Sequence, residues 1–560
     1  MSVERLTRRG FIRRARIGAA ATSVLYLLAA CQSPAPASGP AANATSAPAV
    51  SATSTAGGPT RGGTLVVAQG ADPTPVPGNI DGSAGTVLSG LVYQGLIYVD
   101  KDRNIKPDLA ESWDANADRT EYTFHLRKGV KWQDGQDFTA SDVVFTYTNI
   151  TPKYVATAAA TFKNILQKTE ALDPATVKLT LAKAYGPFLS FLSAPIVPEH
   201  VYSGTDFSSN PHNRMPIGTG PFQLASWTPG DSMRFQASTQ YWKPGQPYLD
   251  SIIIRIIPQG PSRLAALRSG DVDYLPYTEV LPQDFASIRD DPNFQWATGL
   301  TSQAQVMLTL NLQRKPFNNK MFRQALYYAI DRATMVKQIT LDVDSVPVSA
   351  IHKSIGWAQS PDVDMGKMYA FNVDKANQLL DQAGFLRGAD GNRVKPFNML
   401  VEIGRPNFDA ISQFVQQQWK SVGVPVNLMQ LDRQVMQDTV YIKRDFDVNL
   451  NELNSGGDPD VGIARLYTCS SIGPTPLTNG AAYCNPDVDT LFAAGAVPSD
   501  PQQRGPSYAQ AVKILADDLP TLPLIDRQDH SVANNKFELK TTFWSEGLIY
   551  DRMSGVYMKA

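Results

Sequence analysis

Apolar residues recur at two spacings along the chain from Arg61 onward, at every second position or at every third and fourth position. Alternation over 121–127 and 177–181 predicts half-buried strands, because side chains on a strand point to opposite faces in turn. The run 251–257 (SIIIRII) is nearly all β-branched and predicts a central strand covered on both faces. Strands of this kind between helical segments predict an α/β or α+β fold.

Helix ends carry signals of their own. Thr139 and Asp142 have the spacing of a capping box that opens an amphipathic helix. Glycine closes helices because it readily adopts the left-handed conformation. In the second half of the chain these signals predict, in order, a strand at 306–312, a helix from Asn318 or Asn319 to about Gln338, helices at 373–383 and 409–422 that end before Gly384 and Gly423, and a strand at 424–431.

At 560 residues and 61.0 kDa, the chain is too long for a single hydrophobic core. Hydrophobic residues make up 43% and charged residues 18%, which excludes disorder over most of the length and also excludes a polytopic membrane protein. The sequence shows no long linker or short repeat after residue 60. We therefore expect closely packed domains in two lobes, with ligand binding in a cleft between them.

The first 30 residues are expected to be a signal peptide. Residues 1–16 are rich in Arg, and the apolar run 17–30 is too short to cross a bilayer of about 30 Å. The motif at 7–13 (TRRGFIR) resembles a twin-arginine export signal, with general secretion as the alternative. The motif LAAC, which ends at Cys31, resembles the bacterial lipobox and implies cleavage before Cys31 and a lipid on its sulfur.

Residues 31–60 are expected to be the lipidated cysteine and a flexible tether. Of the 29 residues after Cys31, 26 are Ala, Pro, Ser, Thr or Gly, and none is charged. Six arginines and one acid lie in residues 1–60, so the rest of the chain has 45 basic and 51 acidic residues and a net charge of −6. An acidic body has no electrostatic reason to bind nucleic acid.

Cys469 and Cys484 are the only cysteines after the lipobox. In an oxidising compartment the two are expected to pair, which stabilises the fold by about 3 kcal/mol in the loop-entropy model. Metal binding is the weaker alternative, since two thiols fill only half of a tetrahedral site.

The sequence lacks the common catalytic patterns. It contains no Gly-rich phosphate loop, dinucleotide fingerprint, nucleophile elbow or paired-His metalloprotease motif. Of the scattered histidines, His200 and His212 come closest to a metal pair, but ordinary roles are expected for both. Asp271 and Asp273 are expected to lie at the entry to a strand. We therefore expect no catalytic residue, no metal site and no cofactor.

Several segments resemble one known family. They are 91–96 (LVYQGL), 107–113 (PDLAESW), 122–135 (YTFHLRKGVKWQDG), 139–145 (TASDVVF), 216–222 (PIGTGPF), 315–318 (KPFN), 323–332 (RQALYYAIDR) and 457–460 (GDPD). The set is similar to family 5 of the bacterial extracellular solute-binding proteins, the peptide, nickel and oligosaccharide receptors of ABC importers. The resemblance runs from about residue 61 to the end of the chain.

The resemblance implies an α/β, two-lobed periplasmic-binding-protein fold with three domains, with mixed sheets flanked by helices and the ligand cleft between the lobes. The chain would cross between the lobes near Gln303–Leu310 and near Leu519–Ile525. The implied domains are a lobe 1 main domain (61–98, 215–302 and 522–560), a lobe 1 accessory domain (99–214) and lobe 2 (303–521).

The resemblance also places ligand contacts in the segment 451–460 (NELNSGGDPD). Peptide-binding relatives hold the ligand's α-ammonium group with an aspartate three residues before the acidic-Pro step, and Ser455 occupies that position here. A neutral hydroxyl does not balance a buried ammonium, so Glu452 or Asp458 could substitute, or the ligand could be rich in hydroxyls. Alternatively, the segment is a solvated loop in which Asp458 and Asp460 only cap a helix. The candidate contacts are Asn451, Glu452, Asn454, Ser455, Asp458 and Asp460, with Trp357, Trp227 and Tyr93 as stacking candidates.

The expected function is that of an extracytoplasmic substrate-binding lipoprotein, not an enzyme. It would capture a peptide-like small solute by lobe closure and deliver it to an ABC permease with its ATPase. The alternative ligands are an oligosaccharide and a nickel chelate, and the alternative classes are a hydrolase and a ligand-sensing lipoprotein. We expect a monomer that is anchored by its lipid on the periplasmic or cell-surface side of the membrane.

Overall fold

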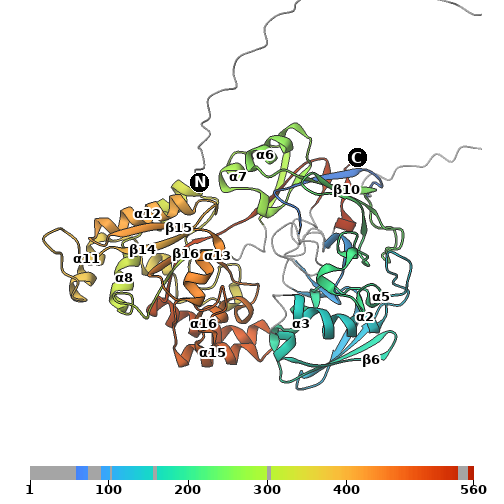
Figure 1. The fold of residues 1–560 in the computed structure, drawn as a ribbon, viewed down its shortest axis with the longest axis horizontal. Helices are drawn as coiled ribbons and strands as arrows, with labels where there is room; N and C mark the ends of the chain where they lie inside the picture. Colours follow the sequence, from blue (N-terminus) through green and yellow to red (C-terminus); the bar gives the residue numbers. More distant parts are fainter. Residues whose placement is uncertain are drawn as a thin grey trace, which may run out of the picture. The chain divides into compact units, whose positions relative to one another are not determined.

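The computed structural model describes residues 59–73, 90–100, 104–155, 161–298, 304–539 and 553–559 (Figure 1). The predicted signal peptide, the lipidation site Cys31 and the predicted tether up to residue 58 lie outside the described residues. None of the helices in the described ranges is long and apolar enough to cross a membrane.

The segments that the resemblance assigns to the main domain of lobe 1 form a seven-stranded sheet with the order β12-β18-β11-β1-β10-β9-β8. The predicted central strand is confirmed as β10, which pairs in parallel with β1 and antiparallel with β9. Its two faces differ: Ile252 and Ile254 are fully buried, whereas on the other face Ile253 is half-buried and Arg255 is exposed, so the expected cover is complete on one face and partial on the other. The strands are β1 (Thr64–Gln69), β8 (Phe222–Thr228), β9 (Ser232–Ala237), β10 (Ser251–Ile256), β11 (Tyr274–Leu275), β12 (Phe294–Thr298) and β18 (His530–Asn534), with α6 (Gly260–Ser269) and α7 (Pro282–Ala286) between them.

The segment 99–214, which the resemblance assigns to an accessory domain of lobe 1, has its own four-stranded antiparallel sheet, ordered β4-β5-β7-β6, and its own core around Phe124, Trp132 and Phe188. The predicted capping box of Thr139 and Asp142 is confirmed at the start of α2. The elements are β2 (Ile97–Val99), β3 (Ile105–Pro107), β4 (Ala110–Ala115), β5 (Glu121–Leu126), α2 (Ala140–Phe145), α3 (Thr151–Tyr154), β6 (Leu166–Asp173), β7 (Thr176–Leu181), the 3-10 helix η2 (Gly186–Ser193) and α5 (Glu199–Tyr202).

Lobe 2 contains a five-stranded sheet ordered β15-β14-β16-β13-β17. The pairing makes β13 antiparallel to both of its neighbours, so the other four strands run in one direction and end at one edge of the sheet. The strands are β13 (Ala304–Leu310), β14 (Phe397–Glu402), β15 (Val426–Leu431), β16 (Val448–Asn454) and β17 (Thr521–Asp526). The helices are α8 (Lys320–Tyr328), α9 (Arg332–Ile339), α10 (Met365–Met368), α11 (Val373–Gln382), α12 (Phe408–Ser421), α13 (Arg433–Gln437), η7 (Asp438–Ile442), η8 (Pro459–Ile463), α14 (Ala464–Tyr467), α15 (Pro486–Ala496) and α16 (Pro501–Asp518).

Two helices occupy the stretch for which the sequence predicts one. Asn319 caps α8 through its side chain, as expected, but α8 ends at Tyr328. The side chain of Asp331 then accepts a hydrogen bond from the backbone N–H of Thr334 and starts α9. A side chain that caps a new helix competes with the continuing backbone hydrogen bonds, so the predicted single helix is interrupted at Asp331.

The chain passes from the lobe 1 sheet to the lobe 2 sheet between β12 and β13, and returns between β17 and β18. The return lies at 527–529, whereas the sequence places the lobe boundary before residue 522. Thr521–Asp526 is buried throughout and pairs with β13, so it completes the lobe 2 sheet before the chain returns.

Candidate ligand-binding site

Charged side chains gather at the edge of the lobe 2 sheet where its parallel strands end. Arg405 follows β14, Glu452 lies near the end of β16, and Arg527 comes directly after β17. In open α/β sheets, ligands bind outside the carboxyl ends of the parallel strands. This edge is therefore the candidate ligand-binding site.

Glu452 lies between the two arginines. Its carboxylate oxygens are 3.9 Å from Nη2 of Arg405 and 4.0 Å from Nε of Arg527. Nε of Arg405 is 3.6 Å from Glu402, and Nε of Arg527 is 3.8 Å from Asp344. These distances exceed the hydrogen-bonding range of about 2.7–3.2 Å. The charges attract one another, but much of their hydrogen-bonding capacity is left for another partner.

Two buried atoms of this cluster show the unused capacity directly. Nε of Arg405 and Oδ2 of Asp344 are buried and have no hydrogen-bond partner in the described part of the chain. Glu402, the other acid beside Arg405, is 19% exposed at its side chain, against 24% for Glu452 and 34% for Arg405. Solvent, and hence a solute, can reach the Arg405 and Glu452 side of the cluster.

The second arginine is more deeply placed, since the side chain of Arg527 is only 12% exposed. Burial lowers its pKa, but the carboxylates of Asp344, Glu452 and Asp529 outweigh burial, and the net pKa is raised. Burial also raises the pKa of Asp344, against the effect of Arg527. Arg527 thus remains a cation at the centre of the cluster.

The loop after β14 sets the direction of Arg405. Gly404 and Asn407 both have positive φ, which turns the chain sharply into α12. The Arg405 guanidinium lies 5.7 Å from the ring centre of Phe408 in the first turn of that helix. Sequence reasoning missed Arg405 and Arg527. Arg527 could have been found from the sequence, because it directly follows the strand near Leu519–Ile525 where the chain is expected to cross back to lobe 1.

The predicted segment 451–460 leads away from Glu452 through a tight turn. Nδ2 of Asn451 donates to Oγ1 of Thr309 at 3.2 Å, and its buried Oδ1 has no partner among the described residues. Asn454 is exposed, and its side chain accepts a hydrogen bond from the backbone N–H of Gly456 at 2.7 Å. Ser455 is 1% exposed, and its Oγ is likewise without a partner in the described ranges. Asn451 and Ser455 therefore offer acceptors for small polar groups.

Asp458 is occupied by protein partners. It forms a two-point ion pair with Arg504, at 2.5 Å and 2.7 Å, and its Oδ1 accepts a hydrogen bond from the N–H of Asp460 at the start of η8. Burial raises the pKa of Asp460, and the nearby Tyr185 hydroxyl acts against this effect. Glu452 differs from Asp458, because its ion pairs with arginine are all 3.9 Å or longer.

The three aromatic candidates lie in different places. Trp357 packs against Tyr508 at 5.7 Å between ring centres and under the Arg504 guanidinium at 5.1 Å, next to Asp458. Nε1 of Trp227 donates to Asp72 at 2.8 Å in lobe 1. Tyr93 is buried in the lobe 1 core, with its hydroxyl 3.4 Å from that of Tyr202. The structure shows no contact between these rings and Glu452 among its described residues.

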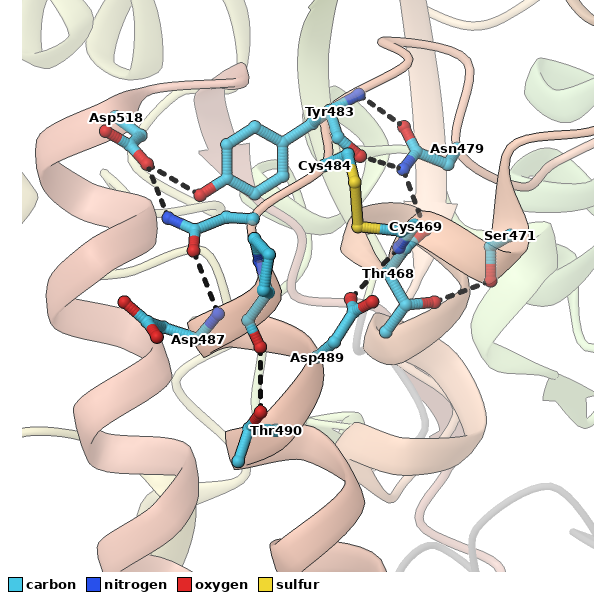
Figure 2. The surroundings of a disulfide bond; sticks show 12 residues. Thr468, Cys469, Ser471, Asn479, Tyr483, Cys484, Asp487, Asp489, Thr490 and Asp518 are labelled. Carbon is cyan, nitrogen blue, oxygen red and sulfur yellow. Dashed lines mark hydrogen bonds between the residues drawn. A yellow bond between two sulfur atoms is a disulfide. The ribbon is translucent and has the colours of Figure 1, made fainter.

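The structure contains the Cys469–Cys484 disulfide that the sequence predicts (Figure 2). Figure 2 shows Asn479 inside the closed segment, where its Nδ2 donates to the carbonyl oxygens of Thr468 and Tyr483. Arg465 joins this segment to the turn beside Glu452. It donates to the carbonyl oxygens of Leu477, Gly462 and Asn454.

Within the described residues, no group of three or more His, Cys, Asp and Glu side chains is placed to hold a metal ion. His200 pairs instead with Asp134 at 2.7 Å, and His212 is exposed.

Comparison with known proteins gives consistent matches. The family model of the bacterial extracellular solute-binding proteins, family 5 Middle, matches residues 104–474. The glutathione-binding protein GsiB of Salmonella typhimurium is 30% identical over 476 residues, which cover 82% of this chain and 88% of that protein.

Two solved structures show the same fold. The oligopeptide-binding protein AppA from Bacillus subtilis, in complex with a nonapeptide, has a TM-score of 0.74 and 25% identity, and the match covers 90% of this chain and all of that one. NikZ from Campylobacter jejuni, in complex with Ni(L-His), has a TM-score of 0.74 and 25% identity over 88% of this chain and 99% of that one.

The chain belongs to family 5 of the bacterial extracellular solute-binding proteins. It has the two-lobed α/β fold of periplasmic binding proteins, and it is an extracytoplasmic receptor that binds small solutes and delivers them to an ABC permease; it is not an enzyme.

Proposed function

We propose that this family 5 protein captures a zwitterionic, peptide-like solute, with Glu452 holding the solute's ammonium group and Arg405 and Arg527 holding its carboxylate. The observation that carries the proposal is the position of Glu452 between two arginines, at distances too long for hydrogen bonds. A ligand that carries both charges would replace these long pairs with short charge-assisted hydrogen bonds.

The proposal also accounts for Ser455. A buried ammonium needs a carboxylate, and Ser455 offers only a hydroxyl. Asp458 is held at two points by Arg504, so moving it to a ligand would leave a buried guanidinium unpaired. Glu452 has no such commitment, and its side chain is partly exposed. The ammonium site is therefore assigned to Glu452.

The relatives support a ligand of this chemistry. GsiB is named for glutathione, AppA was solved with a nonapeptide, and NikZ was solved with a complex of nickel and L-histidine. Each of these ligands carries carboxylate and amine groups. In AppA and GsiB the ligand is a peptide or a peptide derivative, which fits the expected peptide-like solute better than an oligosaccharide.

Attachment to the membrane is the second part of the proposal. The lipobox-like motif before Cys31 supports a lipid anchor, and the uncharged segment 32–60 supports a flexible tether that lets the receptor reach its permease. We propose that the anchored receptor works as a monomer. Labelling with a radioactive fatty acid in cells, compared between wild type and Cys31→Ser, tests the anchor, and equal labelling of the two would contradict it.

Calorimetric titration tests the ligand class. We expect trialanine or glutathione to bind, and N-acetyl-trialanine and trialanine amide to bind about 10–100-fold more weakly, since each lacks one charge-assisted contact. A nickel–histidine chelate and maltotriose are tested in parallel. Binding of maltotriose alone would show that the acceptors of Asn451 and Ser455 define a sugar site and would contradict the zwitterion assignment.

A further inference from the structure

The two lobes touch at a small contact away from the charged cluster. On lobe 1 it is formed by Tyr185 and Gly186, at the start of η2 in the accessory domain. On lobe 2 it is formed by Asp460 in η8 and by Pro498, between α15 and α16. The Tyr185 hydroxyl lies near the Asp460 carboxylate, and burial raises the pKa of both groups.

Gly186 approaches lobe 2 so closely that no side chain fits. A Cβ atom at this position would lie 1.9 Å from the carbonyl oxygen of Pro498 and 3.3 Å from that of Ala496. Both atoms belong to lobe 2. Gly186 does not have a positive φ, so its backbone is outside the left-handed region that favours glycine. The requirement for glycine therefore comes from the opposite lobe.

Arg504 holds the lobe 2 side of the contact together. Its ion pair with Asp458 fixes the start of η8, where Asp460 lies. Its Nε donates to the carbonyl oxygen of Gly495 at 2.6 Å, near the end of α15 and the approach to Pro498. One buried side chain thus ties together the two pieces of lobe 2 that meet Tyr185 and Gly186.

The lobe 1 side is equally well supported. Phe188, in η2, is fully buried in the accessory core, and the Tyr185 ring stacks on Phe191 at 6.4 Å between ring centres. The carbonyl oxygen of Leu192 accepts a hydrogen bond from the N–H of Leu96. The contact therefore joins two firm surfaces and can form fully only when the lobes reach one relative position.

We infer that the contact of Tyr185 and Gly186 with Asp460 and Pro498 is a closure contact, which sets the affinity and residence time of the solute without touching it. The inference rests on the proposed function, because it requires the solute to be held by lobe closure. Free energy gained only in the closed arrangement adds to the apparent affinity, and its loss is expected to appear mainly as faster dissociation.

Gly186→Ala is the sharpest test. The added methyl group collides with the Pro498 carbonyl only when the lobes are closed, so we expect the affinity for trialanine or glutathione to fall by about tenfold or more, mostly through dissociation. Each lobe keeps its own core, so the unfolding temperature of the ligand-free protein should change little, although its lobes meet less often. Gly473→Ala is the matched control, because a Cβ there meets nothing within 4 Å.

Tyr185→Phe tests the approach of the Tyr185 hydroxyl to Asp460 without adding bulk. We expect about 3–10-fold weaker binding, as for the loss of one hydrogen bond. Tyr202→Phe is the control, since its hydroxyl faces Tyr93 within lobe 1. In the double variant of Tyr185→Phe with Asp460→Asn, the two effects should be less than additive.

Hydrogen exchange separates failure of this inference from failure of the proposed function. Without any ligand, Gly186→Ala should increase exchange at the amides of residues 185–191 and 496–499, where the lobes meet. If the wild type binds neither probe but exchange increases, the ligand assignment is wrong and the closure contact stands. If Gly186→Ala changes neither exchange nor affinity, the closure contact is wrong.

Discussion

Glu452 and Asp458 lie on one short segment of lobe 2, and both face arginines, but in opposite ways. Asp458 meets Arg504 at 2.5 Å and 2.7 Å, and the arginine is 3% exposed. Glu452 meets Arg405 and Arg527 at 3.9 Å and 4.0 Å and is partly exposed. A short, buried ion pair stabilises the fold, whereas long ion pairs at the edge of a sheet leave hydrogen-bonding groups available to a ligand. Both residues are acids beside arginines, so only the lengths of their ion pairs distinguish the structural role of Asp458 from the proposed binding role of Glu452.

Asp458→Ala should have the largest effect on stability. It leaves the Arg504 guanidinium buried and unpaired, which typically lowers the free energy of unfolding by about 3–5 kcal/mol. Urea denaturation measures the change. Asp362→Ala, which removes an exposed ion pair with Lys513, is the control and should change little. A full-size loss of binding with unchanged stability would place Asp458 in the ligand site instead.

Removal of the disulfide should come next. The Cys469→Ser and Cys484→Ser double variant opens a loop with a sequence separation of 15, which lowers the free energy of unfolding by about 3 kcal/mol in the loop-entropy model. Because Arg465 links this loop to the turn at Asn454, the affinity should fall as well. Unchanged affinity would show that the turn keeps its shape without the bridge.

Glu452→Gln should weaken binding of a free peptide by about 10–100-fold, equivalent to about 1.5–3 kcal/mol for a hydrogen bond to a charged group. The unfolding temperature should change little, since the variant removes only long ion pairs. Glu121→Gln, which removes a pair with Lys178 in the accessory sheet, is the control. Equal affinity of wild type and Glu452→Gln for trialanine would remove Glu452 from the site.

Arg405→Gln sharpens the assignment of the carboxylate. The wild type should prefer trialanine over its amide by about tenfold, and the variant should show at most a small preference, because the amide has no charge for the guanidinium to meet. A general distortion of the site would weaken the binding of both peptides equally, so the ratio of their affinities reports only the contact with the carboxylate. An undiminished preference in Arg405→Gln would assign the carboxylate to Arg527 alone.

The smallest expected effect concerns pH. Burial raises the pKa of Asp526 to about 7, so its contribution to stability is lost as the pH rises from about 4 to about 7. Burial lowers the pKa of His530 to about 4, so its contribution is lost as the pH falls from about 6.5 to about 4. The two slopes oppose each other. Asp526→Asn removes the first of these slopes and keeps that of His530, so the unfolding temperature of the variant should drop more steeply below pH 6.5 than that of wild type.

Much of the scaffold is predictable from local pattern. The strand at 251–257, the capping box at Thr139 and the cap at Asn319 each depend on residues close in sequence. The split at Asp331 was missed because a capping side chain and a continuing helix compete, and the hydrophobic spacing is the same for both outcomes.

The site was predictable only in part. The family resemblance led to 451–460, and Glu452 was among its candidates, but nothing local distinguishes Glu452 from Asp458. The distinction depends on Arg405, Arg504 and Arg527, which are far apart in sequence and meet these acids only through the order of the strands.

Gly186 gives the receptor a means of adjustment that is independent of ligand recognition. The space opposite this residue is limited by a backbone carbonyl, which cannot move aside as a side chain could. Substitutions of increasing size at position 186 would therefore form a graded series of receptors with the same selectivity and successively weaker retention. Evolution, or the designer of a biosensor, could match such a receptor to a new solute concentration without altering a single ligand contact.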